Sequence, residues 1–102
     1  MNGSSPAYVF LLVQAMLEGA KEQGISEKQA LPLILKTIVG SAKMLEKSSL
    51  SPAEEIQRVC SPGGTTLEAM KVFEDSDFIG IVKHAMTACT KRADEITQSL
   101  ES

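Results

Sequence analysis

The segment SPAEEIQRVCSPGGTTLEAM, residues 51–70, decides the fold because it holds a helix, a break and the start of another helix. Ser51, Pro52 and Glu54 combine an N-cap residue, a first-turn proline and the acid of a capping box. These three residues predict a short helix that begins at Ser51 and ends near Cys60.

The break that follows is Ser61-Pro62-Gly63-Gly64, since prolines and glycines interrupt helical patterns. Thr65 and Glu68 then repeat the capping-box spacing, which predicts that the next helix follows at once. The apolar face of this next helix is predicted to consist of Leu67, Met70, Val72 and Phe73.

Upstream of this segment, residues 6–23 predict a first helix, with Ser5 as its cap, Pro6 in its first turn and Gly24 as its stop. Residues 7–13 are apolar on every face of that helix. A helix that is apolar all round must be buried all round. In so small a chain a partner subunit is the obvious second wall, so we expect a dimer.

A second helix is predicted from Ser26, which stands in capping-box spacing with Gln29, to about Lys47. Pro32 lies inside this helix and has no backbone N–H to donate. We therefore expect a kink at Pro32, or a helix whose regular part starts later.

Residues 74–77 separate the fourth helix from a last helix over about 77–99, after which the polar ending is expected to fray. The candidate core of this last helix is Phe78, Ile79, Ile81, Val82, Ala85, Met86, Ala88, Cys89 and Ile96. No period-2 run and no hairpin signal predicts a strand. The predicted fold class is therefore all-α, a bundle of about five helices.

Composition narrows the classes of function. The chain has 102 residues, of which 43% are hydrophobic and 23% charged, as in one globular domain. The formal net charge of -3, without a basic cluster, predicts no nucleic-acid partner. No apolar run approaches the roughly 18–20 residues of a membrane span. Two cysteines and one histidine are too few for a zinc site or a Ser-His-Asp triad, so no metal is predicted. Because disulfides are rare in the reducing cytoplasm, two cysteines without a disulfide pattern indicate reduced thiols and a cytoplasmic location.

The most informative chemistry lies between residues 60 and 66. Two glycines there allow close approach of the backbone to a ligand, and they lead into a helix start with unpaired N–H groups and the positive end of the dipole. This arrangement predicts a site for a small anion such as a carboxylate or phosphate. The pattern leaves a second interpretation open, in which the glycines only form a turn and Thr65 only caps the helix.

Other polar features favour structural roles. His84 is interpreted as a surface or interface residue. Three acids at the helix junction are interpreted as caps and solvated charges rather than as metal ligands: Glu74, Asp75 and Asp77. Three glycines within helical patterns lower helix stability and suggest close helix-helix approach: Gly19, Gly40 and Gly80.

Four segments, in this order, resemble the C-terminal domain of pyrroline-5-carboxylate reductase. They are SSPAYVF (4–10), AKML (42–45), VCSPGGTT (59–66) and ACTKRADE (88–95). The resemblance covers nearly the whole chain, and its most specific part is the Ser-Pro-Gly-Gly-Thr-Thr block.

The resemblance implies an enzyme family that reduces the C=N bond of 1-pyrroline-5-carboxylate with hydride from NADPH or NADH, the last step of proline biosynthesis. It also implies an N-terminal Rossmann domain, which this chain lacks. We therefore expect an excised or truncated domain, inactive by itself, that covers residues 1–102 and interlocks with a second copy as a homodimer. Some members of the family assemble such dimers into decamers.

The resemblance also implies the roles of individual residues. The Thr66 hydroxyl would bond the ring nitrogen of the imine and is the catalytic candidate. Gly3, Ser4 and Pro6 would lie near the nicotinamide. The residues that would bind the substrate, chiefly through its carboxylate, are Ser61, Pro62, Gly63, Gly64, Thr65 and Thr66.

The sequence departs from the family pattern at three places, one of which is Pro32 inside the second helix. Ser5 stands where the family usually has glycine, and residues 48–51 lack the acid that often precedes Pro52. Two alternative functions stay open: an unrelated helical dimer without catalysis, and a relative that reduces a different cyclic imine or carboxylate.

Overall fold

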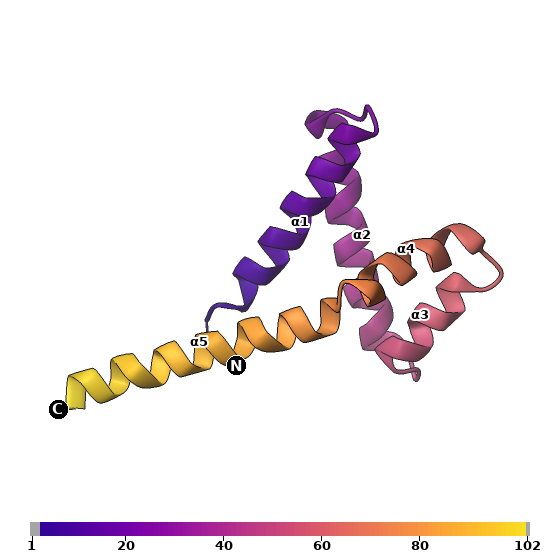
Figure 1. Ribbon diagram of the computed structural model, residues 1–102. Helices are drawn as coiled ribbons and strands as arrows, with labels where there is room; N and C mark the ends of the chain where they lie inside the picture. Colours follow the sequence, from indigo (N-terminus) through magenta and orange to yellow (C-terminus); the bar gives the residue numbers. More distant parts are fainter. Residues whose placement is uncertain (1–2, 102) are drawn as a thin grey trace. The chain divides into compact units, whose positions relative to one another are not determined.

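The computed structural model describes residues 3–101, which form five α-helices and no strand (Figure 1). The helices are α1 (Ser5–Glu22), α2 (Glu27–Lys47), α3 (Pro52–Cys60), α4 (Gly64–Asp75) and α5 (Phe78–Glu101). The predicted all-α class with about five helices is therefore confirmed. The predicted extent of the domain, 1–102, stays a prediction, and residues 1, 2 and 102 lie outside the described part.

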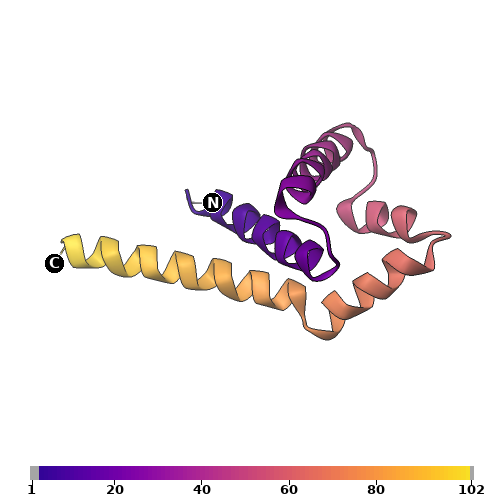
Figure 2. The same ribbon diagram turned by 90° about the horizontal axis from the view of Figure 1, so that it is seen from above.

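The chain divides into two compact units, Met1–Glu55 and Ile56–Ser102. In the first unit, α1 and α2 form a helical hairpin (Figures 1 and 2). Gly24 makes the turn at the end of α1 with a φ of 86°, a left-handed conformation that glycine adopts without the Cβ penalty of other residues. Gly24 thus has the stopping role that its position predicts.

The N-terminal boundaries of α2 and α3 are set by capping boxes. In α2, the Gln29 N–H donates to Ser26 Oγ at 3.3 Å and the Ser26 N–H donates to Gln29 Oε1 at 3.4 Å. In α3, the Glu54 N–H donates to Ser51 Oγ at 3.2 Å and the Ser51 N–H donates to Glu54 Oε1 at 2.9 Å. Both predicted caps are confirmed.

Two details of the first unit differ from the prediction. Ser5 is the first residue of α1 and not its cap, because the backbone at Ser4 is already helical (φ -83°, ψ -16°). Helix α2 is continuous from Glu27 through Pro32, so the expectation of a regular helix that starts later is wrong. Pro32 lies only in the second turn, where a single backbone hydrogen bond is lost.

The core of the first unit is small and lies between α1 and α2. Leu17, Ala30 and Ile34 are the buried hydrophobic residues of the described chain. Half-buried side chains pack around this cluster: Val13, Ala20, Leu31 and Ile38. The turn between the helices brings these residues together, so the hairpin is held by a core of only a few side chains.

The second unit contains α4 and α5, which meet at Asp77. The rings of Phe73 and Phe78 pack edge to face across this junction, with centroids 5.2 Å apart. None of the candidate core residues of α5 is buried in the described chain. The expectation of a core along α5 is thus wrong for a single copy, in which these side chains are exposed or half-buried.

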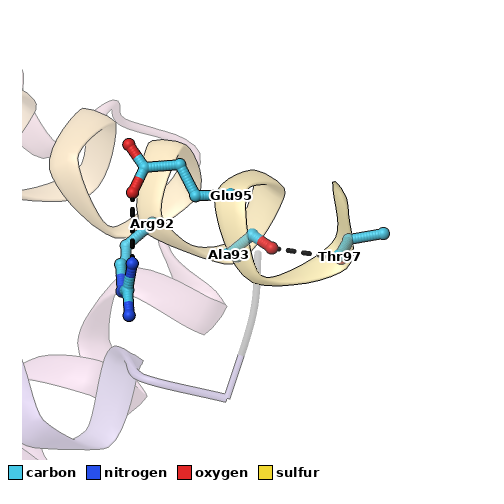
Figure 3. Close-up of polar contacts among 4 residues, drawn as sticks. All are labelled: Arg92, Ala93, Glu95 and Thr97. Atoms are coloured by element: carbon cyan, nitrogen blue, oxygen red, sulfur yellow. Dashed lines mark hydrogen bonds and ion pairs between the residues drawn. The ribbon is translucent and has the colours of Figure 1, made fainter. Parts of the chain in front are cut away.

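Helix α5 continues to Glu101, past its predicted end near residue 99. Its C-terminal part carries local contacts (Figure 3): Arg92 Nη1 lies 3.2 Å from Glu95 Oε2, and the Thr97 hydroxyl donates to the Ala93 carbonyl at 3.1 Å. An exposed ion pair three residues apart contributes a few tenths of a kcal/mol. The helix extends through the segment that was expected to fray.

Large apolar side chains remain exposed in the single copy. In α1, Phe10 is 69% and Leu11 71% exposed, although this half of the helix is predicted to be buried on every side. Val72 in α4 and Ile79 in α5 are also largely exposed. The chain by itself leaves these surfaces uncovered.

Candidate anion-binding site

The loop between α3 and α4 leads directly into the first turn of α4. Ser61 and Pro62 are exposed and joined by a cis peptide bond. Gly63 occupies the N-cap position in an extended conformation (φ -77°, ψ 122°), and no side chain caps the helix. The predicted cap at Thr65 is therefore wrong: the helix begins at Gly64, so Thr65 already lies within the first turn.

The first turn of α4 offers unpaired donors. The N–H groups of Gly64, Thr65 and Thr66 have no carbonyl four residues back within the helix, and no side chain replaces one. Helix α4 has 12 residues and no acid in its first turn. The positive end of its dipole is thus not neutralised by a local carboxylate, which favours a bound anion.

Hydroxyl groups surround these donors. Ser61 and Thr65 are exposed, and Thr66 is half-buried. At Gly64, an added Cβ would find open space, with no other atom within 4 Å. The backbone is therefore accessible at the point where the helix dipole is most positive. The six residues that were singled out from the sequence, 61–66, form one continuous segment at this helix start.

The other predicted site residues lie at the start of α1. Gly3 is exposed, Ser4 occupies the N-cap position without a side-chain cap bond, and Pro6 lies in the first turn. The Ser5 hydroxyl oxygen is buried and has no hydrogen-bond partner within residues 3–101. Residues 3–6 belong to the first unit and residues 61–66 to the second.

The remaining polar candidates have structural roles or are exposed. Asp77 Oδ1 accepts a hydrogen bond from the Gly80 N–H at 3.2 Å and so caps α5, which agrees with the interpretation of this acid as a cap. His84 is exposed. Cys60 and Cys89 form no disulfide within the described residues, and both are half-buried. No group of three potential metal ligands occurs in the described part of the chain.

The buried Ser5 hydroxyl was missed by sequence reasoning. The sequence shows only that Ser5 is followed by a proline, and it does not show which hydroxyl at a helix start lacks a partner. The left-handed backbone of Asp77, with a φ of 55°, was also missed. The sequence indicates this conformation only weakly, because aspartate tolerates left-handed backbone better than most residues do but rarely adopts it.

Among the described residues, no helix combines the length and the apolar character of a membrane span. The family model for pyrroline-5-carboxylate reductase dimerisation matches residues 1–96. Pyrroline-5-carboxylate reductase of Escherichia coli K12 is 39% identical over 99 residues, which is 97% of this chain and 37% of that protein. The Pseudomonas aeruginosa enzyme is 41% identical over 100 residues, 98% of this chain and 37% of that protein.

Solved structures agree with these relatives. A pyrroline-5-carboxylate reductase from Coxiella burnetii has a TM-score of 0.87 and 38% identity, covering 93% of this chain and 35% of that one. Plasmodium falciparum pyrroline carboxylate reductase with NADP bound has a TM-score of 0.81 and 31% identity, covering 84% of this chain and 35% of that one. The chain thus spans little more than a third of the length of the proteins it matches.

Proposed function

The chain belongs to the pyrroline-5-carboxylate reductase dimerisation family, and from that premise we propose that it is the C-terminal domain of an NAD(P)H-dependent reductase that converts 1-pyrroline-5-carboxylate to L-proline. In this proposal the domain supplies the dimer interface and the site for the substrate carboxylate. The observation that carries the carboxylate site is the uncapped first turn of α4.

The carboxylate would be held mainly by the backbone. The N–H groups of Gly64, Thr65 and Thr66 point out of the helix start, and the Ser61 hydroxyl lies in the adjoining loop. Hydrogen bonds to a charged group contribute more than neutral ones, and the helix dipole adds to them. A carboxylate therefore needs no lysine or arginine here, which fits the absence of basic residues from 59–70.

Thr66 is the residue that we assign to the reacting end of the substrate. Its side chain is half-buried, and no hydrogen bond within residues 3–101 occupies its hydroxyl. A threonine hydroxyl both donates and accepts, so it suits the nitrogen of an imine that becomes an amine. Thr66 would hold the C=N group in place while the backbone N–H groups of the same turn hold the carboxylate.

The nicotinamide cofactor would supply the hydride when it is bound. Gly3, Ser4 and Pro6 would lie near it, and the exposed Gly3 and the buried, unpartnered Ser5 hydroxyl suit a polar group at this helix start. Ser5 therefore adds a polar group to this segment where the family has glycine. A cytoplasmic location and a further assembly of dimers stay predictions.

The exposed apolar surface supports the homodimer. Phe10 and Leu11 are largely exposed in the single copy. Full burial of a side chain of this kind stabilises an interface by about 1.5–3 kcal/mol. Large exposed patches of this type mark interfaces. A second copy of the same domain is the occupant that the dimerisation family indicates.

An NMR titration of the 15N-labelled chain with L-proline, the expected product, tests the carboxylate site. We expect saturable amide shifts that are concentrated at residues 61–66. Gly64→Ala should weaken binding at least tenfold, because a side chain at this position hinders close approach of the backbone to the ligand. The fold should be kept, because the added Cβ meets no other atom of the chain within 4 Å. Gly40→Ala is the matched control, since a Cβ at Gly40 also enters open space but lies in α2.

Shifts that map elsewhere, or equal proline affinity in both glycine variants, would contradict the site. The role of Thr66 is tested by kinetics of a full-length reductase that contains this domain. Thr66→Ala should lower kcat for imine reduction while the KM for the nicotinamide cofactor stays the same. Unchanged kcat in this variant would count against the assigned hydroxyl.

A further inference from the structure

The corner between α4 and α5 is built on a single left-handed residue. Asp77 has a φ of 55°, in a region that non-glycine residues rarely adopt. The Asp77 N–H donates to the Glu74 carbonyl at 3.0 Å, and the Ile81 N–H donates to the Asp77 carbonyl at 2.9 Å. The backbone at Asp77 thus closes α4 and opens α5 with no free linker between them.

The side chain of Asp77 fixes the start of α5. Its Oδ1 accepts the Gly80 N–H at 3.2 Å, which is the bond of an N-cap. A Cβ at Gly80 would overlap the Asp77 carboxylate. Gly80 therefore leaves the space that the cap occupies, while the suggestion of close helix-helix approach at this glycine stays a prediction. For Gly19 and Gly40, a Cβ would meet nothing within 4 Å.

An aromatic contact spans the same corner. Phe73 lies in the last turns of α4, and Phe78 is the first residue of α5. Their rings meet at an interplanar angle of 74°, the edge-to-face geometry that aromatic pairs favour. The left-handed backbone and the ring contact restrict the angle between the two helices, and the cap holds Asp77 against the start of α5.

This angle determines where the start of α4 lies. A helix rises about 1.5 Å per residue, so the first turn of α4 lies roughly 18 Å from the corner. A tilt of about 10° at the corner would move the first-turn N–H groups by about 3 Å. Misplacement by about 1 Å is enough to lower catalytic rates about a hundredfold.

We propose that Asp77, with Gly80, is a positioning residue that sets the direction of α4 from α5 and thereby the place of the carboxylate-binding N–H groups. This inference rests on the proposed function of residues 61–66. It adds a residue at the opposite end of the helix from the ligand.

The experiment measures residual dipolar couplings of the amides in α4 and α5, together with the L-proline affinity, in the 102-residue chain. Asp77→Gly keeps the left-handed backbone but removes the carboxylate, and Gly80→Ala blocks the cap. Both variants should change the relative alignment of the two helices and weaken proline binding at least tenfold. Asp77→Asn should restore both readouts, because asparagine tolerates this backbone and retains an acceptor oxygen. Asp94→Ala, at an exposed position on α5, is the matched control.

Couplings that stay the same in Asp77→Gly and Gly80→Ala, with proline binding intact, would overturn the positioning role alone. A variant that only melts at a lower temperature, with unchanged couplings and affinity, would do so as well. Absence of proline binding by the unmodified chain would overturn the proposed carboxylate site and this inference with it, even if the couplings change. The two proposals therefore fail in distinguishable ways.

Discussion

Replacement of Leu11 by alanine tests the dimer most directly. Leu11 lies in the N-terminal half of α1, where apolar residues occupy every face, and its side chain is 71% exposed in the single copy. If a second copy covers this surface, Leu11 is buried only in the dimer. The substitution should therefore weaken dimerisation and leave the fold of each copy nearly unchanged.

The size of the effect follows from the exposed fraction. Leu11→Ala removes three carbon atoms, each worth about 0.8 kcal/mol when buried. For the 71% of the side chain that is exposed, the loss is about 1.7 kcal/mol in each copy. A twofold dimer presents the residue twice, so the dimer loses about 3.4 kcal/mol, and its Kd rises roughly 300-fold. Any cavity that remains would add to this loss.

Sedimentation equilibrium over a dilution series gives the Kd of both proteins. Leu100→Ala is the control, because Leu100 is 83% exposed and its sequence neighbours at 97–99 and 101 are polar. Its Kd should stay within a factor of two or so of the original value. A Leu11→Ala dimer that dissociates less than threefold more readily, or an unmodified chain that is monomeric at micromolar concentration, would refute the reasoning.

Three further predictions concern the stability of the chain. Ile34→Ala should lower the free energy of unfolding in urea by about 2–5 kcal/mol, since Ile34 is one of three buried core residues; a loss below about 1 kcal/mol would show that the hairpin core is not a source of stability. Gly24→Ala should cost about 1–2 kcal/mol in the same assay because φ at Gly24 is 86°, whereas Gly40→Ala, with ordinary φ and open space, should show no such loss. The backbone and side-chain hydrogen bonds with Ser51 lower the pKa of Glu54 from its ordinary 4.5, so this contribution to stability is present above pH 4.5 and is lost as the pH falls through the lowered pKa. Thermal melts of Glu54→Gln across this range should lack that part of the acid sensitivity, and identical pH profiles would argue against it.

The sequence predicts helix boundaries well where a cap is a local side-chain interaction. The pairs Ser26–Gln29 and Ser51–Glu54 lie three residues apart, so the spacing alone determines whether the reciprocal bonds can form. The N-cap of α4 was predicted two residues too late, at Thr65, because an extended Gly63 serves as N-cap without any side-chain bond. Nothing in the residue pattern distinguishes an N-cap at Thr65 from an N-cap at Gly63.

Burial was predicted less well than helicity. Periodicity shows that a helix face is apolar, but it does not show what covers that face. Ile79 and Ile81 were assigned to a core, yet both are exposed in a single copy. The pattern describes the surface of the helix correctly, and the missing information is the identity of the neighbour.

The five helices differ in whether a side chain accepts a hydrogen bond from the backbone N–H groups of their first turn. Side chains cap α2, α3 and α5, through Ser26, Ser51 and Asp77 respectively. Within the described residues, α1 and α4 begin without a side-chain cap bond. Capping is worth about 0.5–2 kcal/mol per helix, and serine, threonine or glycine residues are present at both uncapped starts. At α1 the Ala7 N–H already donates to the Ser4 carbonyl at 3.0 Å, and Pro6 has no N–H. The start of α4 is where the substrate carboxylate is proposed to bind, so a ligand there would supply the acceptors that the chain itself omits.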